Sequence, residues 1–214
     1  NNLNKINLIQ NKALELSLFL SLPACAALLV ASEEITSSLF GYGSFDIQSV
    51  KNSSKALFYF SIGLPAFALI KIFSSFVFAR HNTKTPFVFS VFSVLLNISI
   101  SVYFFSKIGF IIIPIATTIA SWFNALILLI YVKNKNYFTL EFNFINKFIK
   151  IIIMTLLSTF IFYYLVGFFG DNLSYDSNNK LITMILLVII TSIIYILLSI
   201  ITKTFKISDI KLRY

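Results

Sequence analysis

The chain has 214 residues, of which 58% are hydrophobic and 12% are charged, and its mean hydropathy is +0.89. These values lie far from those of soluble domains and indicate an integral membrane protein. The net charge of +9 does not indicate nucleic-acid binding, because the basic residues are scattered over several loops and form no aromatic-lined basic groove.

Six stretches are long and apolar enough to cross a hydrocarbon core of roughly 30 Å as helices. They are residues 13 to 31, 56 to 79, 86 to 106, 110 to 132, 148 to 169 and 181 to 202. Their apolar runs are continuous and do not alternate over about ten residues, as the strands of a barrel would. We therefore predict an all-α polytopic membrane protein with six transmembrane helices.

The first residues suggest a piece of a longer protein. The chain begins at Asn1, without an initiator Met or a cleavable signal pattern, so we expect further sequence upstream. Cys25 is the only cysteine, which excludes an internal disulfide and a multi-cysteine metal site. We interpret Cys25 as a small packed residue of the first span.

The basic residues predict the orientation, since short loops rich in Lys and Arg stay on the cytoplasmic side. If the first span runs outward, twelve basic residues lie inside and four lie outside, with Lys71 within a span. The inside set is Lys5, Lys12, Arg80, Lys84, Lys133, Lys135, Lys147, Lys150, Lys203, Lys206, Lys211 and Arg213, and the outside set is Lys51, Lys55, Lys107 and Lys180. This count also places the C-terminus in the cytoplasm.

The second span carries a lysine deep in the membrane. Lys71 lies nine residues before Arg80, which places it about 13 Å into the core. A lysine facing lipid there would cost about 2.5 to 3.5 kcal/mol, and Ala68, Ser74 and Ser75 give its face a small and polar character. One interpretation is a cavity for an anionic substrate, with Lys71, Ser74, Ser75 and Arg80 as candidate binding residues. The alternative is a structural lysine bonded to neighbouring carbonyls.

Residues 78 to 86, FARHNTKTP, interrupt the apolar sequence after this span. Asn82 and Thr83 favour a turn, and Pro86 suits the first turn of a new helix. We therefore predict a cytoplasmic hairpin turn here.

The third and fourth spans each carry polar residues at helical spacing. The residues are Ser90, Ser93, Asn97 and Ser101 in one span and Pro114, Thr117, Thr118, Ser121 and Asn124 in the other. The linker between the spans is short, so the two helices are expected to be antiparallel neighbours whose polar stripes meet. Two interpretations stay open: hydrogen bonding between the helices, or a small ion site with oxygen ligands from side chains and from carbonyls near Pro114.

The last two spans contain no charge and no proline, and they suit contact with lipid or an acyl chain, or plain anchoring. Enzyme chemistry finds no support, because His81 is the only histidine and Glu15 is the only carboxylate near the membrane core. No nucleophile has a paired base. We therefore do not expect an enzyme.

Three stretches in order resemble the C-terminal part of the MurJ (MviN) family of lipid II flippases. They read LFLSLPACAALLVASEEITSSLFGYGSFD, then ALFYFSIGLPAFALIKIFSSFVFARHNTKTP, then IATTIASWFNALILLIYVKNK. The resemblance covers about residues 13 to 137, and its strongest part is YFSIGLPAFALIKI followed by the FARHNTKTP turn.

The resemblance implies a member of the multidrug/oligosaccharidyl-lipid/polysaccharide exporter superfamily. Such a protein has fourteen helices in total, which form two lobes of six helices each and two extra helices. Residues 1–137 would then be spans nine to twelve, in the second lobe, and residues 138–214 would be spans thirteen and fourteen. The family moves lipid II, the undecaprenyl-pyrophosphate-linked peptidoglycan precursor, from the cytoplasmic to the periplasmic leaflet of the bacterial inner membrane by alternating access. The two extra helices would line a groove for the prenyl tail. Expected partners are lipid II, membrane lipids and other cell-wall synthesis proteins.

The resemblance also implies a possible sodium site as the one candidate cofactor. Asn97 and Thr117 match two side-chain ligands of some family members, and Ile113 would offer its carbonyl. Ser101 stands where those members have an aspartate, which weakens the match and leaves the coupling ion open. Two rival functions remain: an exporter of another polyprenyl-linked glycan, of the O-antigen or teichoic-acid type, and a membrane scaffold that transports nothing.

Overall fold

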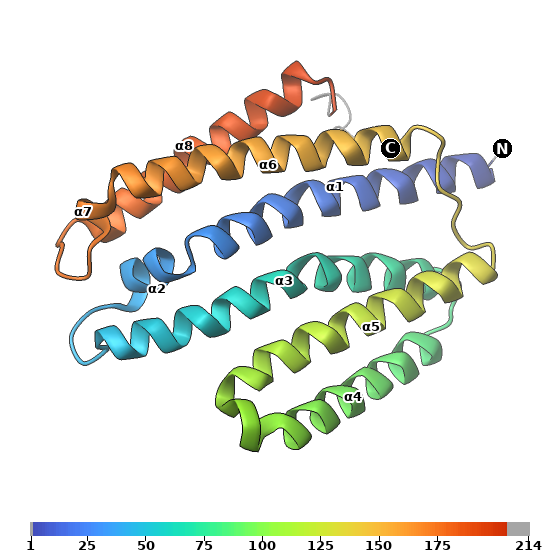
Figure 1. Ribbon diagram of the computed structural model, residues 1–214. Helices are drawn as coiled ribbons and strands as arrows, with labels where there is room; N and C mark the ends of the chain where they lie inside the picture. The colour runs from blue at the N-terminus through green and yellow to red at the C-terminus, as the bar shows by residue number, and fades with distance from the viewer. Residues whose placement is uncertain (1, 205–214) are drawn as a thin grey trace.

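A computed structural model describes residues 2 to 204, and the side chains from residue 5 onwards (Figure 1). All regular structure in this part of the chain is helical, which confirms the predicted all-α fold. The elements are α1 (Asn2–Val30), α2 (Ser32–Phe40), α3 (Ile47–Phe78), α4 (Lys84–Ile108), the 3-10 turn η1 (Gly109–Ile111), α5 (Ile112–Asn134), α6 (Phe144–Phe168), α7 (Gly170–Leu173) and α8 (Lys180–Ile201).

Five helical runs are long and apolar enough to cross a membrane, and one of them, Lys84–Asn134, is 51 residues long. This run turns back at Gly109, whose φ of +73° few other residues adopt readily, so α4 and α5 lie antiparallel (Figure 1). With 25 and 23 residues, each of the two helices is about 35 Å long and could span the bilayer alone. The six predicted spans therefore correspond to α1, α3, α4, α5, α6 and α8.

Two helices extend well beyond the predicted apolar stretches. Helix α1 begins at Asn2 rather than near residue 13, and α3 begins at Ile47 rather than near residue 56. At the start of α3 the Asp46 carboxylate accepts a hydrogen bond from the Ser49 amide at 2.7 Å, which caps the helix. Hydropathy locates the part of a helix that crosses the core, whereas backbone hydrogen bonds continue the helix past it.

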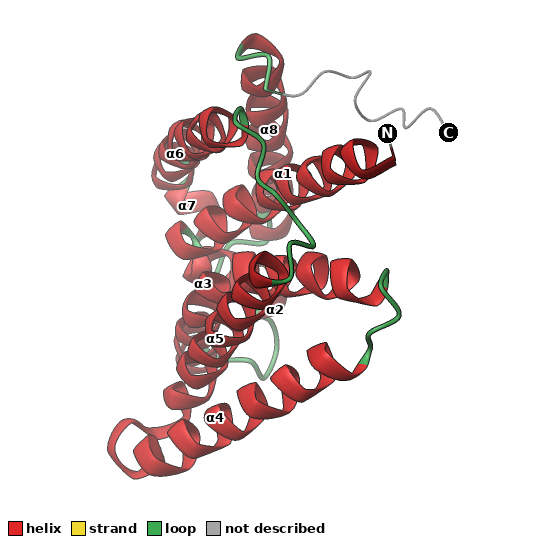
Figure 2. Ribbon diagram, turned by 90° about the vertical axis from the view of Figure 1, so that its right-hand side faces the viewer, coloured by secondary structure: helices red, strands yellow, loops and turns green. Residues whose placement is uncertain are grey.

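The helices form a row in the order α8, α6, α1, α3, α5 and α4 (Figure 2). Helix α1 packs on both α3 and α6, and α5 packs on both α3 and α4. Helix α4 scarcely touches α3, although the two are consecutive, and Figure 2 shows it splayed away from α3. Among residues 2 to 204, no helix therefore packs against one side of the second half of α3.

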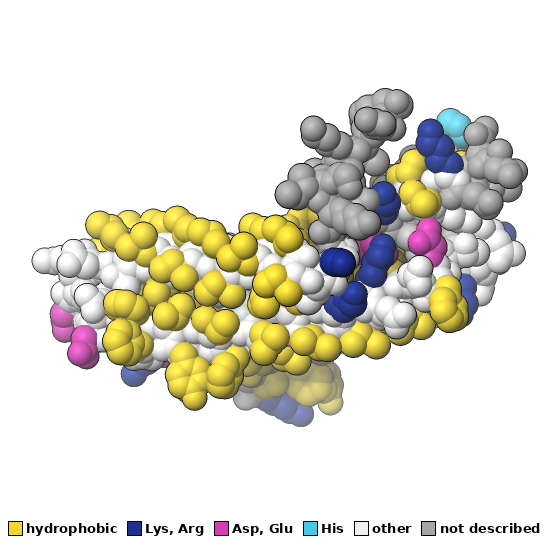
Figure 3. All heavy atoms as spheres, turned by 90° about the horizontal axis from the view of Figure 1, so that it is seen from above, with side chains coloured by type: hydrophobic (Ala, Val, Ile, Leu, Met, Phe, Trp, Pro, Cys, Tyr) yellow, Lys and Arg dark blue, Asp and Glu magenta, His cyan; other side chains and the backbone are white. Residues whose placement is uncertain are grey.

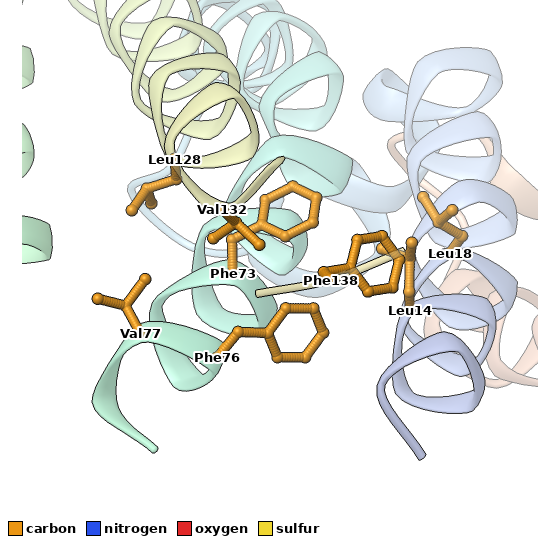
Figure 4. Close-up of a cluster of buried hydrophobic side chains, with 8 residues drawn as sticks. All are labelled: Leu14, Leu18, Phe73, Phe76, Val77, Leu128, Val132 and Phe138. Atoms are coloured by element: carbon orange, nitrogen blue, oxygen red, sulfur yellow. The ribbon is translucent and has the colours of Figure 1, made fainter. Parts of the chain in front are cut away.

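The linker between α5 and α6 is anchored by a buried aromatic residue. The Phe138 side chain is 5% exposed and lies between α1 and α3, with its ring centroid 5.4 Å from that of Phe76 (Figure 4). The other members of this cluster are Leu14, Leu18, Phe73, Val77, Leu128 and Val132. Three helices and the linker thus share one apolar core.

Polar contacts hold the same linker to α1. The Asn11 amide donates to the Thr139 carbonyl at 2.8 Å and accepts from the Glu141 amide at 3.1 Å. Glu15, which is 3% exposed, forms an ion pair with Lys147 of α6 at 2.8 Å. Helix α1 therefore binds the last helices as well as α3, although the predicted division between residues 1–137 and 138–214 assigns it to the first part only.

The two ends of the helix row differ in charge. We call the end with the Arg80 turn and the α5–α6 linker the linker end, and the opposite end the α2/α7 end. Nine described basic residues lie at the linker end: Lys5, Lys12, Arg80, Lys84, Lys133, Lys135, Lys147, Lys150 and Lys203. Four described basic residues lie at the α2/α7 end: Lys51, Lys55, Lys107 and Lys180. On the face seen in Figure 3, dark blue side chains gather toward the linker end. Lys206, Lys211, Arg213 and the C-terminus, which we predicted to be cytoplasmic, lie outside the described residues.

Candidate functional site

Lys71 lies on the uncovered face of α3. Exposed residues follow this half of the helix at spacings of four, four and three, at Phe67, Lys71, Ser75 and Phe78. Among the residues that the structure describes, no hydrogen bond or ion pair involves the Lys71 ammonium group. Within the described residues the Lys71 ammonium is therefore unpaired, and the sequence predicts that it lies at a depth where an isolated charge is costly.

A groove of about 590 Å³ lies beside this face, between the end of α3 and the start of α4. Ser74, one helical turn from Lys71, lines the groove together with Lys84 and Ser90. The Ser75 hydroxyl, in contrast, donates to the Ile72 carbonyl of its own helix at 2.7 Å. Hydroxyl and ammonium groups at this place suit an anionic group, which both could bind as donors.

Arg80 is engaged elsewhere. Its guanidinium donates to the Phe76 carbonyl at 2.7 Å and to the Tyr137 carbonyl at 2.8 Å, and it lies 4.1 Å from the centroid of the Tyr137 ring. These contacts close the end of α3 and tie it to the α5–α6 linker. Of the four candidate residues, Ser74 lines the groove, whereas Lys71, Ser75 and Arg80 are not among its lining residues. A substrate contact by any of the four therefore stays a prediction.

The FARHNTKTP stretch is a tight turn, as predicted, and Pro86 lies in the first turn of α4. Asn82 organises it: its side-chain oxygen accepts from the Thr85 amide at 3.1 Å, and its amide donates to the Tyr131 hydroxyl of α5 at 3.1 Å. His81 adopts a positive φ of 57° at the tip. The turn thereby fixes the start of α4 relative to α5.

The four residues of the predicted sodium site form one hydrogen-bonded chain between α4 and α5. Asn97 donates from its amide to the Thr117 hydroxyl at 3.0 Å, and Ser101 donates to the Asn97 side-chain oxygen at 3.1 Å. Thr117 in turn donates to the Ile113 carbonyl at 2.8 Å. The two polar stripes therefore meet, as the sequence predicted.

This cluster offers neutral oxygen atoms only. Two hydroxyls, one amide oxygen and one carbonyl are hard ligands that suit a monovalent cation better than a transition metal. Within residues 2 to 204, no group of three or more His, Cys, Asp or Glu side chains could hold a metal ion. The hydrogen bonds also join the two helices without any ion. Both interpretations of the stripe, interhelical bonding and an ion site, are therefore compatible with this geometry.

Polar residues of α5 also contact α3, in addition to those that contact α4. The sequence alone did not show which polar residues face which helix. The Thr118 hydroxyl donates to the Tyr59 carbonyl of α3 at 2.7 Å, and the Trp122 indole donates to the Ile62 carbonyl at 3.0 Å. Gly63 lies at this crossing, where a Cβ would stand only 3.2 Å from the Thr118 hydroxyl oxygen. Small and polar residues thus bring α3 and α5 into close approach.

An apolar groove of about 350 Å³ lies between α1, α6 and α8. Its walls are mostly apolar, with a few hydroxyls: Phe19, Leu20, Pro23, Ala24, Ala27, Ser158, Thr159, Phe162, Val188, Thr191, Ser192, Tyr195 and Ile196. The Tyr195 hydroxyl donates to the Phe19 carbonyl at 2.9 Å, which fixes one wall. The groove suits an extended hydrocarbon chain.

Lys180 is a buried cation that sequence reasoning placed in an outer loop. It is 2% exposed, and its ammonium donates to the carbonyls of Gly41 at 2.6 Å and Tyr175 at 2.5 Å. The rings of Tyr42 and Tyr175 lie 4.4 and 4.5 Å from it, and the Tyr175 hydroxyl bonds the Phe45 carbonyl at 2.9 Å. Lys180 thus joins the start of α8 to the α2–α3 loop, and no local motif could reveal this contact.

These features define a class of protein: a multi-pass helical membrane protein that holds polar groups inside its helix row and a cation on an uncovered face. The sequence model of the family described as Lipid II flippase MurJ matches residues 1–184. The chain belongs to this family, which confirms the resemblance seen in its motifs.

Individual proteins of the MurJ family are also similar to this chain in sequence. The chain is 43% identical over 127 residues to the probable lipid II flippase MurJ of Rhizobium meliloti (strain 1021), which covers 59% of this chain and 24% of that protein. It is 30% identical over 195 residues to the lipid II flippase MurJ of Thermosipho africanus (strain TCF52B), covering 91% of this chain and 39% of the relative. The chain thus spans well under half the length of these curated relatives.

The fold agrees as well. A solved structure of the lipid II flippase MurJ in an inward closed conformation superposes with a TM-score of 0.76 and 29% sequence identity. The match covers 94% of this chain and 40% of that structure. The arrangement of the helices is therefore that of part of a MurJ protein.

Proposed function

We propose that this chain is the C-terminal part of a flippase that moves lipid II from the cytoplasmic to the periplasmic leaflet by alternating access. The observation that carries the proposal is Lys71, an unpaired cation on an uncovered helix face at membrane depth, in a chain that belongs to the MurJ family. The pyrophosphate of lipid II is an anion that such a lysine would bind. This is a transport function, in which no covalent bond is made or broken.

The charge distribution supports an orientation. The linker end, with nine described basic residues against four on the other side, is the cytoplasmic end of the proposed arrangement. The membrane is then the bacterial inner membrane, and the α2/α7 end faces the periplasm. Residues 1–137 belong to the second lobe of a fourteen-helix protein and residues 138–214 to its two extra helices. Contacts with other cell-wall synthesis proteins stay a prediction.

The prenyl tail of lipid II has a place in this proposal. The apolar groove between α1, α6 and α8 is lined mostly by hydrocarbon groups. An apolar tail in this groove would be as well shielded from water as it is in lipid. The groove is lined in part by α1, the helix that packs on α3. The tail would thus stay in the membrane while the charged head contacts the face of Lys71.

Sodium is the coupling ion that we propose for the cluster of Asn97, Ser101, Ile113 and Thr117. The cluster joins α4 to α5, so an ion bound there would stabilise one arrangement of these two helices. The absence of a carboxylate from the cluster predicts a weak site. A ligand from elsewhere in the complete protein would strengthen it.

The experiment that tests the function uses the full-length protein in proteoliposomes. We expect lipid II to become accessible to an external modifying enzyme, while a polyprenyl-linked O-antigen unit in matched vesicles does not. Equal movement of both substrates would favour a general exporter of polyprenyl-linked glycans. No movement of either substrate, in protein shown to be folded, would favour a scaffold.

A further inference from the structure

The groove between the end of α3 and the start of α4 has a second cation, Lys84, in its lining at the linker end. Lys84 is exposed, and among the described residues its ammonium group forms no hydrogen bond or ion pair. Residues 47 to 134, which include α3, α4 and α5, contain no Asp or Glu that could neutralise it. The groove therefore has a positive potential, which favours an anionic ligand.

Two serine hydroxyls in the same lining are available as donors. Ser74 of α3 and Ser90 of α4 are half-buried, and neither hydroxyl donates a hydrogen bond to another described residue. The Ser90 oxygen accepts from the Asn124 amide at 3.4 Å. In contrast, Ser93 and Ser99 of α4 donate to carbonyls of their own helix at 2.9 and 2.8 Å. Ser74 and Ser90 can therefore donate to a ligand in the groove.

The backbone at the start of α4 offers few donors of its own. The Thr85 amide donates to the Asn82 side-chain oxygen at 3.1 Å, and Pro86 has no N–H group. The helix dipole adds positive potential at this end, but the hydrogen bonds to an anion would come mainly from side chains. The donors are thus the Lys84 ammonium and the two serine hydroxyls.

The other lining residues of the groove are largely apolar. The rings of Phe78 and Phe87 are 48% and 68% exposed and border it together with Pro86. A free anion would gain nothing from these rings, whereas an anion attached to a hydrocarbon chain would cover them. The lining therefore suits a phosphate group at the end of a lipid.

Lys71 lies beyond the inner end of this groove, on nearly the same side of α3. Seven residues separate it from Phe78, which corresponds to about 20° less than two full turns and to about 10 Å along the helix. Ser74 lies between them. An anion held in the groove would thus be about two helical turns from Lys71, with a hydroxyl donor on the way.

We propose that Lys84, together with Ser74 and Ser90, binds the pyrophosphate of lipid II at the cytoplasmic entrance of the transport path, before the pyrophosphate reaches Lys71. This inference rests on the function proposed above and assigns the loading of the substrate to Lys84. A pyrophosphate carries more than one negative charge, so two lysines match it better than one. The positive-inside pattern explains a lysine at this end, but it does not explain the groove or the two donor hydroxyls.

Binding of lipid II to the purified full-length protein in detergent tests this site separately from transport. We expect Lys84→Ala to weaken lipid II binding about three- to tenfold and Lys84→Arg to retain most of the affinity. Lys135→Ala, at the same end but outside the groove, is the matched control and should bind as the parent does. An unchanged affinity of Lys84→Ala would overturn the proposal, whether or not the parent protein transports lipid II.

Transport kinetics in proteoliposomes separate loading from the deeper contact. Lys84→Ala is expected to raise the lipid II content that gives half-maximal translocation by the same factor, and to change the maximal rate less than about twofold. Lys71→Ala should instead lower the maximal rate. A lower maximal rate of Lys84→Ala with unchanged half-saturation would contradict the loading role. A parent protein that binds lipid II through Lys84 but does not move it would refute the proposed function and leave the binding site intact.

The hydroxyl contacts are tested by the Ser74→Ala, Ser90→Ala double variant, with its unfolding temperature measured on the same preparation. We expect it to bind lipid II about two- to fivefold more weakly, and Ser99→Ala, outside the groove, to bind as the parent does. A lower unfolding temperature with unchanged affinity would assign the two hydroxyls to the fold and contradict their place in the site.

Two competitors identify the group that Lys84 recognises. Inorganic pyrophosphate that displaces lipid II as well as undecaprenyl diphosphate does would show a site for a free phosphate. Phosphatidylglycerol that binds as tightly as lipid II would show a general surface for anionic lipids. Either result would overturn the proposal, and we expect undecaprenyl diphosphate to be the strongest of the three competitors.

Discussion

Replacing Lys71 by alanine is expected to slow lipid II translocation without harming the fold. The side chain is exposed on α3, and its ammonium has no partner among the described residues, so its loss breaks no contact in this part of the protein. Removing a charge from membrane depth also removes an insertion cost of about 2.5 to 3.5 kcal/mol. Insertion and stability should therefore be unchanged or improved.

The expected effect on transport follows from one lost contact to the pyrophosphate. A hydrogen bond to a charged group contributes about 1.5 to 3 kcal/mol, which corresponds to about a 10- to 150-fold decrease in the translocation rate if the contact forms in the rate-limiting state. Lys71→Arg keeps the charge and should retain most of the activity. Lys55→Ala, on the same helix but at the α2/α7 end, is the matched control and should change the rate less than about twofold.

The assay is translocation of labelled lipid II by the full-length protein in proteoliposomes, with membrane insertion and unfolding temperature measured on the same preparations. Unchanged translocation by Lys71→Ala would refute the role of this lysine. A loss of translocation that accompanies failed insertion would show a structural lysine instead.

Four other changes test separate parts of the structure. Thr117→Val removes two hydrogen bonds of the α4–α5 cluster and should abolish any stabilisation by NaCl over KCl at equal ionic strength; a parent protein that does not distinguish the two salts would end the sodium hypothesis. Lys180→Met removes two hydrogen bonds and two ring contacts of a buried cation, and should lower the free energy of unfolding in detergent by about 2 to 4 kcal/mol; a loss below about 0.5 kcal/mol would contradict its structural role. Gly63→Leu should separate α3 from α5 and lower the unfolding temperature by more than Gly63→Ala does, and equal effects would mean that the helices are not closely packed there. The hydrogen bonds from Ser49 hold the pKa of the Asp46 carboxyl below its usual value of 3.8, so its stabilisation of α3 is present above about pH 4 and is lost as the pH falls through the lowered pKa. The unfolding temperature should therefore fall more steeply below pH 4 in the parent protein than in Asp46→Asn. Parallel dependence of the two unfolding temperatures on pH would argue against this cap.

Local sequence was sufficient for features that depend on one helix or on two adjacent helices. Hydropathy located all six apolar helices, although it could not locate their ends. The spacing of Asn97 and Thr117 predicted contact between α4 and α5 because only a short turn joins these helices. Asn82 and Pro86 predicted the turn before α4 because their effect on the backbone is local to that turn.

The remaining contacts depend on residues that are far apart in the chain. Arg80 meets Tyr137, 57 residues later, only because the α5–α6 linker returns across the end of α3. Lys180 is buried by Tyr42 because α8 packs beside α2. Such contacts are set by tertiary packing, which no periodicity within one helix records.

Depletion of the complete protein from living cells is the best test of the proposal that it moves lipid II across the membrane. We expect lipid II to accumulate on the cytoplasmic side of the inner membrane and the cells then to lyse. The parent gene, but not Lys71→Ala, should restore normal lipid II levels. If depletion left lipid II levels and its appearance in the periplasmic leaflet unchanged, the protein would not be the lipid II flippase.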